Sequence, residues 1–168
     1  MKTIIVIPAY NDNKHISTLI NKLSECTDLP LLIIDDGSDK KLELDKSIYV
    51  IRNKENRGKG YSLLKGFKHA YSSGFTHAIT IDADLQHDPQ YISDFIETDE
   101  IYDIVIGRRD FKNTMPLLRK ISNIITSYLI SKIVHQKVYD SQCGYRRYNL
   151  TLLLSSSYKE KGFQFESE

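Results

Sequence analysis

Short apolar runs alternate with amphipathic stretches along the chain. Five apolar runs of four or five residues predict buried strands, at residues 3–7, 31–34, 48–51, 78–81 and 103–106, and Pro8 closes the first. Three stretches with helical spacing predict helices, at residues 14–26, 60–71 and 117–134. Asp88 followed by Pro89 has the sequence of a further helix start, for a helix through about Ile96. This alternation predicts an α/β domain with a mostly parallel sheet flanked by helices.

Size and charge narrow the class of protein. The 168 residues suit one compact domain, and 40% hydrophobic residues suffice for its core. A formal net charge of +1 gives no general attraction to nucleic acid, so we expect no nucleic-acid partner. Cys26 and Cys143 lie far apart and form no CxxC pair, which argues against a zinc site or a disulfide framework. A reducing compartment is therefore expected.

No targeting or membrane-spanning segment is apparent. The first ten residues hold one lysine and a short apolar run that ends at Pro8, too short for a secretory signal. The most apolar later stretch, 124–134, is interrupted by Thr126, Ser127, Ser131 and Lys132. It falls short of the roughly 18 apolar residues of a membrane helix. We expect a cytoplasmic location, with peripheral contact at the cytoplasmic membrane face as an option.

Acidic residues follow two of the predicted strands. One run ends in Asp35 and Asp36, and another continues into Asp82 and Asp84. The carboxyl ends of parallel strands meet at one sheet edge, where ligands of open α/β sheets bind. Both acidic pairs should therefore face one crevice, and Tyr10 and Asp12 follow the first strand at the same edge.

The spacing of Asp82 and Asp84 suits a metal ion. Residues i and i+2 of an extended chain point to the same side. Two hard oxygen ligands favour Mg²⁺ or Mn²⁺, which would also neutralise a diphosphate. The alternative is that the aspartates only cap the next turn. Two acidic strand ends at one edge favour the metal site.

Two further loops could reach the crevice. Residues 56–60, NRGKG, lack the spacing of a phosphate-binding loop, so they either contact a ligand or simply open the next helix. Arg108 and Arg109 follow a strand end and could pair with phosphate, or be solvated charges. Among the histidines only His87 lies beside the acidic loop.

The segment before and within the last predicted helix is basic and amphipathic. Residues 108–120 hold five basic residues against Asp110, a local charge of +4. Apolar residues line one side of the helix: Leu117, Ile121, Ile124, Ile125, Tyr128, Leu129 and Ile133. Such a helix could lie on an anionic membrane. Packing of its apolar side on the sheet, or on a part beyond the chain, is the favoured alternative.

Taken together, the motifs resemble a known family. They occur at residues 6–12 (VIPAYND), 33–39 (IIDDGSD), 56–60, 82–89 (DADLQHDP), 107–109 and 140–148 (DSQCGYRRY). The chain is similar over nearly its whole length to the inverting glycosyltransferases of family 2, which have the GT-A fold. The pattern is most similar to that of polyprenyl-phosphate glycosyltransferases. The resemblance implies one catalytic domain over residues 1–168, C-terminally incomplete, that serves cell-envelope glycan synthesis.

The resemblance also implies roles for individual residues. The residues expected to bind the nucleoside-diphosphate sugar are Pro8, Tyr10, Asp12, Asp36, Lys59, Asp82, Arg109 and Arg146. Asp82, Asp84 and Gln86 would hold Mg²⁺ or Mn²⁺. Asp140 and Arg146 would lie beside the acceptor, a lipid phosphate or a glycan. For a hydroxyl acceptor, Asp140 or Glu166 could act as general base.

Two other functions stay open at the level of sequence. A nucleotidyltransferase would also use paired aspartates and a metal, but it should carry a glycine-rich and basic loop near the first strand. VIPAYNDN has none. A non-catalytic nucleotide-sugar-binding fragment is the second alternative. The sugar, the base and the acceptor are not specified by the sequence.

Overall fold

The computed structural model describes residues 1–45, 48–109, 117–156 and 165. Its centre is a six-stranded sheet in the order β3-β2-β1-β4-β6-β5. The strands are β1 (Thr3–Ala9), β2 (Leu31–Asp35), β3 (Tyr49–Arg52), β4 (His77–Thr80), β5 (Ile104–Ile106) and β6 (Arg146–Asn149). Strands β1 to β4 pair in parallel, whereas β6 is antiparallel to both β4 and β5. The α/β class and the mostly parallel sheet are thus confirmed.

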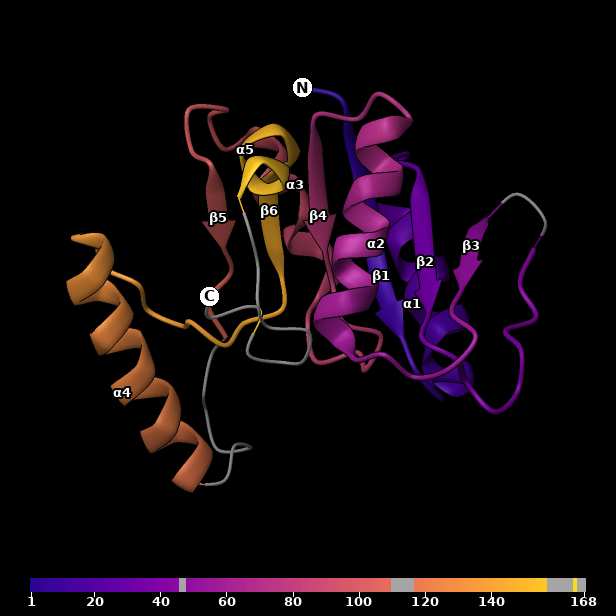
Figure 1. Cartoon of the computed structure of the whole chain (residues 1–168), viewed down its shortest axis with the longest axis horizontal. Coiled ribbons are helices and arrows are strands. Elements are labelled where there is room, and N and C mark those ends of the chain that lie inside the picture. The colour runs from indigo at the N-terminus through magenta and orange to yellow at the C-terminus, as the bar shows by residue number, and fades with distance from the viewer. Residues whose placement is uncertain (46–47, 110–116, 157–164, 166–168) are drawn as a thin grey trace.

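Helices cover both faces of this sheet (Figure 1). They are α1 (Asn13–Cys26), α2 (Lys59–Ser72), α3 (Ile92–Glu97), α4 (Leu117–Val134) and α5 (Leu150–Ser155), with a 3₁₀ turn at Pro89–Tyr91. One core cluster joins the sheet to α1 and α3, and the other joins it to α2 and α5. Gly66 of α2 lies so close to Val6 and Ile34 that an added Cβ would meet them at 2.7 and 3.1 Å. The helix therefore packs directly on the strands.

The first strand runs farther than predicted. β1 continues through Pro8 to Ala9. Ile5 donates its backbone N–H to the β2 side, at Pro30, so alternate residues, Pro8 included, face β4. Pairing with β4 ends at Val6, so the missing N–H of Pro8 leaves no sheet hydrogen bond unmade.

Two elements at the end of the described chain were not predicted. β6 carries Arg146 and Arg147, which are both buried. The guanidinium of Arg147 donates to the backbone carbonyls of Phe95, Thr98 and Asp99, and these bonds make its burial possible. Asn149 then caps α5 by accepting hydrogen bonds from two backbone N–H groups of its first turn.

Helix α4 does not pack its apolar side on the sheet, which was one of the two packings favoured above; packing on a part beyond the chain stays untested. It lies beyond β5 at the border of the domain (Figure 1), and all of its described apolar side chains except the half-buried Ile130 are exposed: Ile121, Ile124, Ile125, Tyr128, Leu129, Ile133 and Val134. The side chains that it buries are polar, Asn123 and Ser127. Packing of the apolar side on the sheet is therefore wrong. The physical reason is a set of polar partners on loop 138–141, which satisfy the polar side of the helix.

Candidate active site

One edge of the sheet collects the functional loops. β1 to β4 run in one direction, and β5 runs with them because it pairs antiparallel to β6. Their carboxyl ends lead into Tyr10, Asp36, Asn53, Asp82 and Gly107. β6 runs the opposite way, so the loop that precedes it reaches the same edge. This reversal explains how residues 140–145 meet residues far earlier in the chain.

The two aspartates of the DxD motif lie at this edge in different environments. Asp82 is partly buried, and its Oδ1 lies 2.6 Å from the Lys59 ammonium. Asp84 is exposed, and its Oδ1 accepts a hydrogen bond from the backbone N–H of Gln86 at 3.0 Å. Asp84 thus does cap its turn through Oδ1. Its second carboxylate oxygen, Oδ2, is not used by this cap and can serve a ligand. Gln86 itself is exposed.

These carboxylates could hold a divalent cation only together with a ligand. Among the described residues, no three His, Cys, Asp or Glu side chains gather into a metal site. Two hard carboxylates fit Mg²⁺ or Mn²⁺ when diphosphate oxygens and water complete the shell, which is the usual arrangement for Mg²⁺. The Lys59 ammonium on Asp82 shows that this carboxylate already attracts a cation.

Lys59 comes from the start of α2. Gly58, with φ of 91°, turns the chain into the helix. The Lys59 side chain is only 10% exposed, so its charge is held in the site and not in bulk water. The NRGKG loop therefore places a cation beside Asp82 in addition to opening the helix.

Asp36 organises that loop. Its buried carboxylate accepts hydrogen bonds from the Asn53 side chain and from the backbone N–H groups of Arg57 and Gly58, at 2.7, 3.0 and 2.8 Å. Gly37 has φ of 76°, and an added Cβ would lie 2.5 Å from the Glu55 backbone. This close approach brings the two loops together. The loops after β2 and β3 are thus organised around Asp36.

Pro8, Tyr10 and Asp12 lie at the end of β1. Tyr10 is exposed, so its ring is available to a ligand. Asp12 is the N-cap residue of α1, without a side-chain capping bond, and its Oδ1 lies 3.6 Å from the His15 ring nitrogen Nδ1. Asn11 joins this loop to the loop after β2 through its backbone N–H, which donates to Ser38 Oγ at 2.9 Å.

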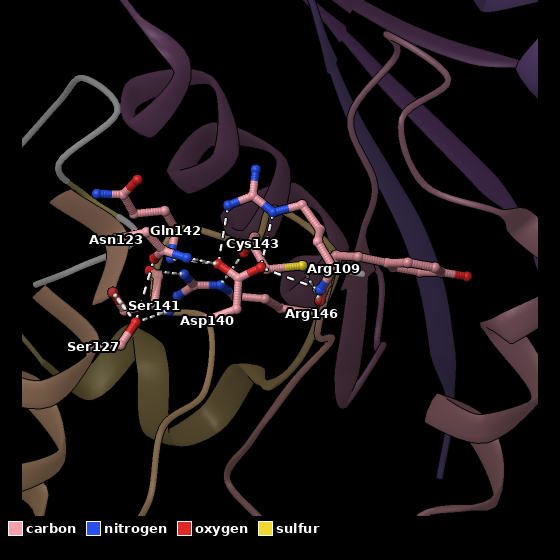
Figure 2. A network of polar contacts seen from close by, with 9 residues as sticks. Arg109, Asn123, Ser127, Asp140, Ser141, Gln142, Cys143 and Arg146 are labelled. Atoms are coloured by element: carbon pink, nitrogen blue, oxygen red, sulfur yellow. Dashed lines mark hydrogen bonds and ion pairs between the residues drawn. The ribbon is translucent and has the colours of Figure 1, made fainter. Parts of the chain in front are cut away.

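The most densely bonded group of the site is the Asp140 carboxylate (Figure 2). Arg109 contacts both of its oxygens, with Nε at 2.8 Å and Nη2 at 2.9 Å, and adds its backbone N–H at 3.2 Å. The Asn123 amide donates at 2.9 Å and the Gln142 backbone N–H at 3.3 Å. Five donors therefore surround a side chain that has no exposed surface.

These bonds decide the charge of the group. Burial alone would raise the pKa of Asp140, but the hydrogen bonds and the positive charge of Arg109 outweigh it and hold the pKa below its usual range. The hydrogen bond to Asp140 in turn raises the pKa of Arg109, and the nearby charge of Asp82 adds to this. An ionised carboxylate so fully engaged is poorly suited to accept a proton. It is well suited to hold Arg109 in place.

Gly144 brings this ion pair next to the DxD motif. A Cβ on Gly144 would lie 2.3 Å from Asp82 Oδ2, so the Asp82 carboxylate rests on the bare glycine backbone. Arg146, which follows, is buried and donates from Nε to the Cys143 carbonyl and from Nη2 to the Ser141 carbonyl, both at 2.7 Å. It holds the loop that carries Gly144.

His87 and Glu166 are the remaining site candidates from the sequence. His87 is buried against the Tyr145 ring, and burial lowers its pKa, so it is neutral beside Asp82 and Asp84. Glu166 lies outside the described residues. Sequence reasoning missed Asn123 and Gly144. The spacing of Asn123 and Ser127, i and i+4 on a helix, was the available indication of a buried polar stripe.

Comparison with known proteins agrees with this geometry. The model of the family "Glycosyl transferase family 2" matches residues 4–160. The chain is 31% identical to a UDP-N-acetylglucosamine–dolichyl-phosphate N-acetylglucosaminyltransferase of Methanococcus voltae, over 98% of this chain and 76% of that protein. It is 24% identical to a polyprenol monophosphomannose synthase of Mycolicibacterium smegmatis, over 98% of this chain and 69% of that protein. The chain belongs to glycosyl transferase family 2 and is a glycosyltransferase.

The solved structures confirm the fold. Glucosyl-3-phosphoglycerate synthase from Mycobacterium tuberculosis, crystallised with Mn²⁺, UDP and phosphoglyceric acid, superposes with a TM-score of 0.76 at 18% identity. The match covers 99% of this chain and 61% of that one. The predicted GT-A fold is thus confirmed, and family membership decides against the nucleotidyltransferase alternative.

Proposed function

We propose that this chain transfers a sugar from a nucleoside-diphosphate sugar to a polyprenyl phosphate, with inversion at the anomeric carbon. The observation that carries the proposal is the closeness of two ion pairs, Lys59–Asp82 and Arg109–Asp140: Asp82 rests against Gly144, four residues after Asp140, and its charge raises the pKa of Arg109. They place two cations and the DxD carboxylates in one crevice. A diphosphate requires such a set.

The donor would lie across the sheet edge. Its nucleoside end belongs near Tyr10 and the loop held by Asp36, and its diphosphate near Lys59 and Arg109. Mg²⁺ or Mn²⁺, held by Asp82 and Asp84 with Gln86 nearby, would supply positive charge to the leaving diphosphate. The Mycobacterium tuberculosis neighbour was crystallised with Mn²⁺ and UDP, which supports this assignment.

The transfer itself is one displacement. An acceptor phosphate oxygen attacks the anomeric carbon from the face opposite the diphosphate. The bond from that carbon to the diphosphate oxygen breaks, and the electron pair leaves with the nucleoside diphosphate. Arg109 and Lys59 stabilise the charge that develops there. A phosphate acceptor is already ionised, so no base is required, which agrees with the engaged state of Asp140.

Helix α4 is the element that we expect to meet the acceptor. No helix in the described part of the chain is long and apolar enough to cross a membrane. The exposed side of α4 is nevertheless apolar, and residues 111–139 contain five basic and no acidic residues. Lys132 lies over the Tyr128 ring and Lys137 over that of Tyr139, an aromatic and basic combination suited to a lipid interface. We infer that α4 lies on an anionic leaflet, where it would meet a lipid-linked phosphate.

The test combines transfer with membrane binding. UDP-, GDP- and dTDP-sugars are offered with Mn²⁺ and with undecaprenyl phosphate in anionic vesicles, and the glycolipid product is detected by mass spectrometry. Undecaprenol, which has the chain but no phosphate, is the matched acceptor control. Product should form only with the phosphate. Transfer only to a soluble glycan hydroxyl would overturn the lipid-phosphate acceptor.

Vesicle sedimentation tests the surface directly. Ile133, on α4, is 76% exposed, and Ile101, on the loop before β5, is 74% exposed. Ile133→Glu should weaken binding to anionic vesicles, whereas Ile101→Glu should not. Basic residues near an anionic leaflet contribute about 1 kcal/mol each, so binding should also fall at high salt. Equal binding by both variants would rule out α4 as the contact.

A further inference from the structure

We propose that Asn123 is a positioning residue of the donor site, which holds Arg109 in place through the Asp140 carboxylate. The inference rests on the proposed function in taking Arg109 to bind the diphosphate. Asn123 is the one buried amide on a helix whose apolar side chains point away from the domain, in the described part of α4. Its position calls for a specific partner.

A polar stripe attaches α4 to the domain. Ser127 Oγ accepts the backbone N–H of Ser141 at 2.9 Å and lies 3.1 Å from the Ser141 hydroxyl. Ser131 Oγ accepts the backbone N–H of Val138 at 2.9 Å. With Asn123 these side chains follow one another at i, i+4 and i+8. The helix is therefore held by directional bonds, which fix its position along its axis as well as its distance.

The stripe also fixes the orientation of the Asn123 amide. Ser127 Oγ donates to Asn123 Oδ1 at 3.3 Å, and Asn123 Nδ2 donates to Asp140 Oδ1 at 2.9 Å (Figure 2). A carboxylate can only accept, so the NH₂ group must face it. The amide therefore has one favourable orientation, and it presents a donor to the buried carboxylate.

The effect passes from Asp140 to Arg109. Asp140 Oδ1 receives both the Asn123 amide and Arg109 Nη2, while Oδ2 receives Arg109 Nε and the Arg109 backbone N–H. Rotation of the Asp140 carboxylate would break its bond to Asn123 together with its pair with Arg109. The Asn123 bond therefore helps to keep the carboxylate in the orientation that holds Arg109. Asp140 is one contact removed from the proposed ligand and Asn123 is two; partners directly behind a metal ligand typically change affinity by about 10- to 100-fold when mutated, so the lower end of that range is expected for Asn123.

The experiment uses Asn123→Leu, which keeps the branched shape and removes the donor. Calorimetry with Mn²⁺ measures the affinity of the wild type and the variant for UDP and GDP, and for UMP and GMP, which lack the second phosphate. Asn123→Ala serves as a second variant should leucine prevent folding, and thermal melts verify the fold. Ser131→Ala removes a bond of the same stripe that does not touch Asp140, so it is the matched control.

The expected result is selective for the diphosphate. Asn123→Leu should lower affinity for the tighter-binding nucleoside diphosphate about tenfold, and affinity for the corresponding monophosphate less than about twofold. Ser131→Ala should change neither affinity. A merely structural role would lower both affinities together. An equal loss, or no loss, in a folded variant overturns the inference. Absence of any nucleoside-diphosphate binding by the wild type would instead overturn the proposed function.

Discussion

Replacement of Asp140 by asparagine should destabilise the domain strongly, although the two side chains have the same shape. An amide that keeps its oxygen toward Asn123 and Gln142 turns its NH₂ group toward the Arg109 backbone N–H and Nε. Two hydrogen bonds to a charged group are lost, each worth about 1.5–3 kcal/mol. The sum agrees with the usual cost of about 3–5 kcal/mol for removing one partner of a buried ion pair.

Urea unfolding followed by circular dichroism measures this cost. For a domain of this size, each kcal/mol corresponds to a shift of about 2–4 °C in Tm, so a cost of about 3–5 kcal/mol should lower the Tm by roughly 6–20 °C. Asp84→Asn is the matched control, because Asp84 is exposed and accepts one local hydrogen bond. Its free energy of unfolding should change by less than about 1 kcal/mol. Equal midpoints for the two variants would refute the reasoning.

The destabilisation should also depend on pH. The pKa of Asp140 is lowered in the folded state, so its stabilising contribution is fully present above the unfolded value of about 3.9. That contribution is lost as the pH falls through the lower, folded value. The gap between wild type and Asp140→Asn should be constant from about pH 5 to 7 and should narrow below about pH 4. A gap that widens on acidification would contradict the ionised, paired state of Asp140.

Three further substitutions test the donor site. Asp84→Ala should abolish metal-dependent binding of nucleoside diphosphates in a folded protein, and affinity that is unchanged in EDTA would remove the metal from the proposal. Asp36→Ala should weaken nucleoside binding, because it removes the carboxylate that holds Asn53 and the backbone of Gly58 in place. Calorimetry with a nucleoside monophosphate measures this loss. Gly144→Ala should displace the Asp82 carboxylate and lower diphosphate affinity, since its Cβ would lie 2.3 Å from Asp82 Oδ2. Full affinity in that variant would show that Asp82 can move freely.

The donor half of the fold could be predicted because its information is local. Each strand from β1 to β4 is an apolar run, and the carboxyl-end rule for parallel strands then brings Asp36 and Asp82 to one edge. β6 could not be predicted in this way, because Arg146 and Arg147 make its sequence look exposed. Their burial depends on backbone carbonyls at residues 95–99 and 141–143, and the more distant set leaves no local pattern.

The orientation of α4 could not be predicted for a similar reason. Periodicity predicts that a helix has two faces, but it does not say which face is inside. Thr126, Ser127 and Ser131, which interrupt the apolar run, served only as evidence against a membrane span. Asp140 decides the orientation, because a buried carboxylate requires donors and Asn123 supplies one. The side-chain reach of Lys59 to Asp82 likewise depends on how α2 packs, and not on spacing.

The backbone N–H of Gly107, just after β5, donates to the carbonyl of Tyr145, just before β6, at 2.9 Å. Residues 107–145 therefore form an excursion from the sheet that begins and ends at neighbouring strands. Helix α4, its basic stretch, Asp140 and Arg109 lie on this excursion, whereas the proposed metal and nucleoside positions lie before it. The chain therefore has the layout of a fixed platform for the metal and the nucleoside, with one continuous segment that carries α4 and also Arg109 of the diphosphate site. A graft of another family member's segment between Gly107 and Tyr145 would be the natural unit for redirecting transfer to a different acceptor, provided that the graft carries its own counterparts of Arg109, Asn123 and Asp140.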